Sequence, residues 1–169
     1  ILLLYWSLLA FIVADEPFSL GGNLVRKIAI ALLGKDHLYK GFGIAFDPEG
    51  ILSTLPAACT VIIGYYTGEI IGKGSPGGKT VLKLLLLGVA SAGLGYLWSL
   101  VFPINKPLWS SSYVLYTAGF AMGFLALIYL ISDVLKFRLW GTPFMVFGTN
   151  ALFTYFFAGF YLWLLCLNF

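Results

Sequence analysis

Long apolar runs separated by short polar loops dominate this chain. Five runs can be marked, at about residues 1–13, 51–72, 80–102, 111–132 and 143–167, and all but the short first run reach the roughly 20 residues that a helix needs to cross a bilayer. The apolar character is continuous and shows no strand-like alternation, which favours helices over a barrel. The pattern predicts an all-α, polytopic membrane bundle with about five transmembrane helices. Residues 1–169 then form a single transmembrane domain.

Composition supports this class. Hydrophobic residues make up 60% of the chain and charged residues 10%, whereas a soluble domain carries roughly 25% charged residues. The net charge of +3 is too small to indicate a nucleic-acid partner. Cys59 and Cys166 both lie inside apolar runs without metal-ligand spacing, so we expect neither a disulfide nor a metal site.

Two short basic turns predict the orientation. Lys73–Lys79 and Asp133–Arg138 are separated by two apolar runs, so they share one side of the membrane. Short loops that carry Lys and Arg tend to stay in the cytoplasm. Two polar islands, residues 46–54 and 103–113, would then face the opposite compartment together.

The stretch 14–50 is expected to be an extracytoplasmic loop. Within it, residues 23–33 predict a short amphipathic helix lying along the membrane surface. The loop carries four basic residues of its own, which argue against this orientation. The expected location is the bacterial inner membrane, or an organelle membrane if the chain is eukaryotic.

Glycines spaced by four residues mark the predicted helix contacts. Gly64, Gly68 and Gly72 form two such pairs and Gly119 with Gly123 forms a third. This spacing lets helix backbones approach closely. Tight packing within one bundle is the favoured interpretation, and a substrate groove lined by glycines is the alternative.

The two polar islands are the candidate site, because charged and amide groups at a membrane mouth are costly to desolvate. In the first island, Asp47 and Glu49 stand immediately before an apolar run. They could cap the following helix, as could Ser53 and Thr54, or orient or deprotonate a substrate group. Either carboxylate could also pair with Lys106 of the second island.

The second island combines an amide, an ammonium group, hydroxyls and aromatic rings. Asn105, Lys106, Trp109, Ser112 and Tyr113 lie within nine residues. Trp and Tyr are common at the edge of a membrane and Lys can extend toward the headgroups. The same groups also suit a sugar ring or a nucleotide-bearing ligand.

Three further polar positions have alternative interpretations. His37, the single histidine, is either an exposed loop residue or a catalytic base. Asn150 lies in the middle of the last run, where it either bonds another helix or faces a polar cavity. Glu69 is expected to pair with Lys73 four residues on.

Gly78-Lys79-Thr80 resembles the end of a nucleotide-binding loop, but the required glycine and preceding strand are missing, so this motif is rejected.

In order and spacing, the islands resemble the heparan-α-glucosaminide N-acetyltransferase family and its bacterial relatives. The matching stretches are residues 46–54 leading into 62–68, then 102–113 and 143–152. The likeness covers nearly the whole chain. It implies transfer of an acetyl group from acetyl-coenzyme A in the cytoplasm to an amino sugar on the lumenal or exterior side.

The residues expected to bind substrate or the co-substrate acetyl-coenzyme A come from both islands and the last run. They are Asp47, Glu49, Asn105, Lys106, Trp109, Ser112, Tyr113 and Asn150. The family's essential histidine stands in a His-x-x-Trp-x-Gly stretch that this sequence lacks, and His37 has a different context. The resemblance therefore predicts the C-terminal portion of a longer protein, inactive by itself.

The expected partners are an amino-sugar or glycan substrate, membrane lipid and the N-terminal part of the same protein, with a homo-oligomer left open. A transporter or flippase-like protein for a sugar or lipid-linked substrate is the alternative function. Such proteins usually carry charges or broken helices near the membrane midplane. Here the midplanes hold Asn150 and scattered Ser and Thr, which favours the acyltransferase.

Overall fold

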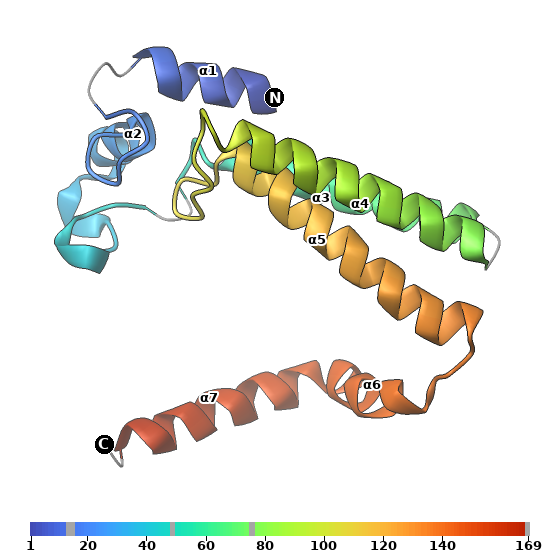
Figure 1. Ribbon diagram of the computed structural model, residues 1–169. Helices are drawn as coiled ribbons and strands as arrows, with labels where there is room; N and C mark the ends of the chain where they lie inside the picture. The colour runs from blue at the N-terminus through green and yellow to red at the C-terminus, as the bar shows by residue number, and fades with distance from the viewer. Residues whose placement is uncertain (13–15, 48–49, 75–76, 168–169) are drawn as a thin grey trace.

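The computed structural model describes residues 1–12, 16–47, 50–74 and 77–167, and it consists of helices joined by loops (Figure 1). The α-helices are α1 (Leu2–Ile12), α2 (Leu24–Leu33), α3 (Thr54–Lys73), α4 (Gly78–Trp98), α5 (Ser111–Tyr129), α6 (Thr142–Thr149) and α7 (Ala151–Leu167). Short 3-10 turns lie at Lys35–His37, Gly41–Gly43 and Leu139–Gly141, and a π-helical turn, Leu130–Val134, extends α5. Within these residues, β pairing is limited to one isolated bridge between Tyr39 and Phe46. The all-α prediction is confirmed.

Three helices are long and apolar enough to cross a membrane, namely α3, α4 and α5 with its π-helical extension. The pair α6 and α7 would make a fourth span if it is counted as one, but it bends by 84°. Helix α1 has 11 residues, which at 1.5 Å per residue is about half of the roughly 30 Å of hydrocarbon in a bilayer. The described residues therefore support three or four spans where the sequence predicted about five.

Helices α4 and α5 pack through glycine. A Cβ atom added to Gly119 would lie 2.4 Å from the Ala92 nitrogen and 2.5 Å from the Gly88 carbonyl oxygen. One added to Gly95 would lie 2.5 Å from the Tyr116 nitrogen. Real side chains do not approach a backbone this closely, so the crossing requires glycine at these positions.

The predicted glycine contacts of α3 are not present in the described structure, since Cβ atoms added to Gly64, Gly68 and Gly72 would meet nothing within 4 Å. Gly123 of α5 lies at the crossing, because a Cβ atom added to Gly88 would be 3.2 Å from the Gly123 nitrogen, although one added to Gly123 itself would meet open space. The spacing correctly predicts a close helix contact at Gly119 and wrongly predicts one along α3. A four-residue spacing places glycines on one face, but only the neighbouring helix decides whether that face is used.

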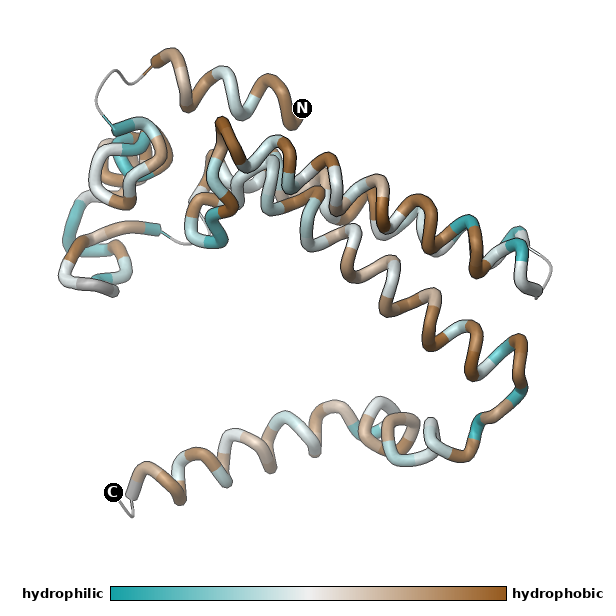
Figure 2. The backbone as a smooth tube through the Cα atoms, viewed as in Figure 1, coloured by the Kyte–Doolittle hydropathy of each residue, from teal (hydrophilic) through white to brown (hydrophobic). Residues whose placement is uncertain are grey.

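The bundle has two distinct ends. At one end an apolar cluster of Tyr5, Leu9, Val25, Phe102 and Leu108 joins α1 and α2 to the second island. At the other end Val81 and Leu84 of α4 pack with Ala126 and Tyr129 of α5, and Ile70, Ile71, Leu130 and Val134 lie against them. Both basic turns are therefore at one end and both islands at the other. Figure 2 shows the hydrophilic residues gathered toward these ends and the apolar residues along the long helices.

The predicted surface helix in the 14–50 loop is confirmed as a helix. Asn23 caps α2 by accepting a hydrogen bond from the Arg26 nitrogen at 2.8 Å. Arg26 ties the helix to the loop, donating from Nε to the Ala45 carbonyl at 2.7 Å and from Nη1 to the Gly21 carbonyl at 2.9 Å. Its position along the membrane surface stays a prediction.

Asn150 divides the last apolar run instead of lying within one continuous helix. Its side chain donates to the Val146 carbonyl at 2.9 Å, and its own carbonyl accepts from the Thr154 nitrogen at 2.9 Å. In the described structure the amide is exposed and its side chain bonds Val146 and Thr149 of its own segment, so the bond to another helix and the polar cavity stay predictions. Asparagine competes in this way with helical hydrogen bonds. The resulting α6–α7 arm lies apart from the other helices (Figure 1).

Candidate functional site

The two islands meet at one small cavity. Phe46 and Asp47 of the first island line it together with Asn105 of the second, and Arg26 of α2 also lines it. The cavity measures about 10 Å³, which is room for about one water molecule. It is therefore too small to hold a sugar, and the contact around it positions the two islands relative to each other.

Asn105 is largely engaged in building its own loop. Its Oδ1 accepts a hydrogen bond from the Leu108 nitrogen at 3.2 Å, and its backbone nitrogen donates to Ser110 Oγ at 3.0 Å. Ser110 Oγ also accepts from the Tyr113 nitrogen at 3.3 Å, which caps α5. Such Asn and Ser bonds fix a turn without any help from helix or sheet.

Ser112 is fully buried. Its hydroxyl donates to the Phe102 carbonyl at 2.5 Å and lies 3.1 Å from Ser110 Oγ. A hydroxyl with these partners and no exposed surface is a structural group. The structure places this predicted site residue in the interior of the second island.

Trp109 and Tyr113 form an aromatic pair at the surface of the same island. Their ring centroids lie 5.5 Å apart with an interplanar angle of 72°, and both side chains are half-buried. Trp109 Nε1 donates to Thr60 Oγ1 of α3 at 3.3 Å. The backbone of Trp109 has φ of +51°, a left-handed conformation that bulky residues rarely adopt. The turn thus holds an indole ring beside α3 at the island end of the bundle.

Helix α1 is attached to the same island by two hydrogen bonds. The buried Tyr5 hydroxyl donates to the Leu108 carbonyl at 2.6 Å, and Ser111 Oγ donates to the Leu2 carbonyl at 2.8 Å.

Ser53 of the first island precedes α3 without making a side-chain capping bond, so its predicted capping role is wrong. Its backbone is already helical there, whereas a capping residue is usually extended.

Ion pairs do not join the two islands within the part of the chain that the structure describes. The pairs found there are Lys40–Asp36 at 3.9 Å, Arg138–Asp133 at 3.6 Å and Lys73–Glu69. The last of these confirms the predicted pairing of Glu69. Lys106 is exposed and is not paired with Asp47 in this set. Glu49, its other predicted partner, lies outside the described residues.

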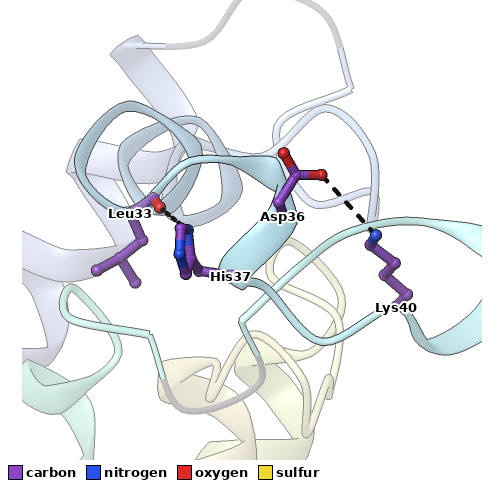
Figure 3. Close-up of polar contacts among 4 residues, drawn as sticks. All are labelled: Leu33, Asp36, His37 and Lys40. Carbon is purple, nitrogen blue, oxygen red and sulfur yellow. Dashed lines mark hydrogen bonds and ion pairs between the residues drawn. The ribbon is translucent and has the colours of Figure 1, made fainter.

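His37 lies on the surface, beyond the end of α2. Its Nδ1 is 3.0 Å from the Leu33 carbonyl oxygen, and the neighbouring Asp36 pairs with Lys40 (Figure 3). The side chain is exposed and does not line the island cavity. The interpretation as an exposed loop histidine is confirmed.

Two residues at this end of the bundle are absent from the sequence-based site. Arg26 lines the cavity beside Asp47, and Thr60 bonds the indole of Trp109. Arg26 lies on the polar face of the predicted amphipathic helix, and this pattern could have marked it as a candidate site residue. Thr60 lies inside an apolar run, and nothing in the sequence pattern marks it as a candidate.

Comparison with known proteins identifies relatives, although no family model matches the chain. Heparan-alpha-glucosaminide N-acetyltransferase of Homo sapiens is 34% identical over 155 residues, which cover 79% of this chain and 22% of that protein. The Mus musculus protein of the same name is 32% identical over 155 residues, covering 79% of this chain and 23% of its own length. The chain thus spans less than a quarter of these two relatives.

A shorter similarity points to a different class. The trehalose transport system permease protein SugA of Mycobacterium tuberculosis is 30% identical over 77 residues, covering 46% of this chain and 24% of the permease. The acetyltransferase similarity is longer and includes most of the chain. Over 79% of its residues the chain is therefore related to the heparan-alpha-glucosaminide N-acetyltransferases, which confirms the resemblance carried by the two islands.

Proposed function

We propose that this chain is part of a membrane-bound N-acetyltransferase that moves an acetyl group from acetyl-coenzyme A to an amino sugar. The similarity to two N-acetyltransferases over 79% of the chain carries the proposal. The meeting of the two islands at one end of the bundle supports it, because those islands hold the motifs of the resemblance.

The chemistry requires a base and a stabilised oxyanion. The acceptor amine attacks the thioester carbonyl, a C–N bond forms, the C–S bond breaks, and the coenzyme A thiolate leaves. A base takes the amine proton, and hydrogen-bond donors stabilise the oxyanion that develops. We assign the base to the histidine motif of the family, which this sequence does not contain.

The chain's own contribution is to bind and orient the acceptor. Asn105 and Ser112 are committed to the loop. The side chains that we propose for ligand contact are Asp47, which lines the cavity between the islands, Lys106, and the ring pair of Trp109 and Tyr113. A carboxylate can accept hydrogen bonds from sugar hydroxyls. An aromatic face beside it can stack on a sugar ring. The island cavity has room for about one water, so the acetyl donor is not held inside it.

Two observations favour transport as the second candidate function. The last apolar run is broken at Asn150 with an 84° bend, and broken helices are typical of transporter binding sites. The permease similarity is the other observation, although it covers 46% of the chain. Solute flux through vesicles without acetylation would identify this class.

The test of the acetyltransferase proposal compares two carboxylates of the same region in the full-length protein. Asp47→Asn should lower the rate of glucosamine acetylation by about tenfold or more, as expected when a charged hydrogen-bonding partner is lost. Asp36→Asn removes an exposed carboxylate that does not line the cavity and should leave the rate unchanged. Equal rates for both variants would remove Asp47 from the site. Absence of any acetylated amino sugar with the wild-type protein would refute the proposal.

A further inference from the structure

A lysine-lined pocket opens at the turn between α3 and α4, at the end of the bundle opposite the islands. Its volume is about 490 Å³. Lys73 at the end of α3 lines it, together with Lys79 and Lys83 in the first turns of α4. Glu69 is the acidic side chain among the lining residues.

The charges in this pocket are not balanced by the protein groups around it. Glu69 pairs with Lys73, whereas Lys79 and Lys83 take part in none of the ion pairs found among the described residues. The first turn of α4 contains no acidic residue. Lysines at a helix N-terminus add to the positive end of the helix dipole, and two like charges four residues apart repel each other. The arrangement therefore favours an anion in the pocket.

The pocket lies where a span begins. Val81 and Leu84 of α4 are buried against α5 next to the two lysines. One side of this part of α4 is thus packed in the bundle, while Lys79 and Lys83 line an open pocket at its end. Lysines in this position lie at the level of lipid headgroups and bind phosphate oxygens well as point charges.

We propose that this pocket binds a phosphate group, held by Lys79 and Lys83 with Lys73 beside them. The phosphate belongs either to the headgroup of an anionic phospholipid or to a soluble phosphorylated ligand. The inference rests on the lysine cluster alone and does not depend on the proposed function.

Binding can be measured on the purified chain in detergent by native mass spectrometry and by the shift in melting temperature. The lipid probe is phosphatidylglycerol, and the comparison is phosphatidylcholine, whose phosphate is balanced by a choline cation so that its net charge is zero. The soluble probes are pyrophosphate and adenosine 3′,5′-bisphosphate. Preference for phosphatidylglycerol would identify a lipid site, and saturable binding of the bisphosphate would identify a soluble ligand. Both results support a phosphate site.

The variants test whether the lysines are responsible. The double substitution Lys79→Gln with Lys83→Gln should weaken binding of the preferred probe by about tenfold, because two charge-assisted hydrogen bonds are lost. Glu69→Gln should strengthen binding, because it frees Lys73 and removes the negative charge. Lys136→Gln removes an exposed lysine at the same end of the bundle but outside the pocket, and it should have no effect.

Two results would overturn the proposal. One is the absence of any preference for the anionic probes, phosphatidylglycerol, pyrophosphate and the bisphosphate, over zwitterionic phosphatidylcholine. The other is an equal loss for the double variant and for Lys136→Gln, which would indicate a general attraction to surface charge. If the double glutamine variant does not fold, two other variants decide the outcome. These are Glu69→Gln and the charge-preserving double substitution Lys79→Arg with Lys83→Arg. Unchanged probe binding by Glu69→Gln, or loss of probe binding by the arginine variant, would contradict the proposal.

Discussion

At the residue scale, the predicted site divides into groups that build a loop and groups that can meet a ligand. Asn105 and Ser112 are bonded within the second island, whereas Asp47 lines the contact between islands and Trp109 lies half-exposed beside α3. The sequence singled out these polar positions because such groups are rare near a membrane. It could not separate the two roles, since they depend on where each hydroxyl and amide finds its partner.

Ser112→Ala tests the structural role directly. The substitution leaves the Phe102 carbonyl without its hydroxyl partner in a buried place, which typically costs about 1–3 kcal/mol. We expect a lower melting temperature of the purified chain. Ser99→Ala is the matched control, because that hydroxyl also donates to a nearby carbonyl but is exposed to solvent. Equal stability of the two variants would contradict the assignment.

At the element scale, the long helices could be predicted and the break in the last run could not. Helices α3, α4 and α5 follow continuous apolar runs, and the structure begins and ends them within a few residues of the predicted bounds. The run from Pro143 onward is equally apolar, and no proline or charge marks position 150. The break there depends on hydrogen bonds that Asn150 makes to its own backbone neighbours, and a hydropathy pattern does not contain this information.

The contact between α4 and α5 makes a sharp prediction about two glycines on one helix. Gly119→Ala would press a methyl group against the α4 backbone and should destabilise the bundle by about 1–3 kcal/mol, as overpacking usually does. Gly123→Ala meets open space and should be neutral or stabilising by up to about 1 kcal/mol, because alanine favours helix. Thermal unfolding in detergent measures both. Similar destabilisation by the two substitutions would be inconsistent with this helix crossing.

At the scale of the whole molecule, the chain has an island end and a basic end joined by three long helices. Paired spans explain why the sequence already placed the islands together: an out-and-back helix pair returns the chain to the same face. The positions of α1 and α2 depend on tertiary contacts such as the bond from Tyr5 to Leu108, so the contribution of Arg26 to the site was missed. Our assignment of the basic end to the cytoplasm rests on its short Lys- and Arg-bearing loops.

Cysteine labelling tests that orientation. With Cys59 and Cys166 replaced by serine, Phe137→Cys places an exposed thiol in the basic turn and Ile104→Cys places one in the second island. Both substitutions leave the charges of the loops intact. An impermeant reagent added to intact cells should label the cysteine at position 104 and not the one at 137. Labelling of both positions from the same side would contradict the two-ended arrangement.

The most direct test of the central claim is the release of coenzyme A by the full-length protein in lipid vesicles supplied with acetyl-coenzyme A and glucosamine. An acetyltransferase should form one N-acetylglucosamine for each coenzyme A released. We expect a lower rate when Trp109 is changed to Ala, because the aromatic surface offered to the sugar is lost. Movement of the sugar across the vesicle membrane without coenzyme A release would contradict the acetyltransferase account and identify a transporter.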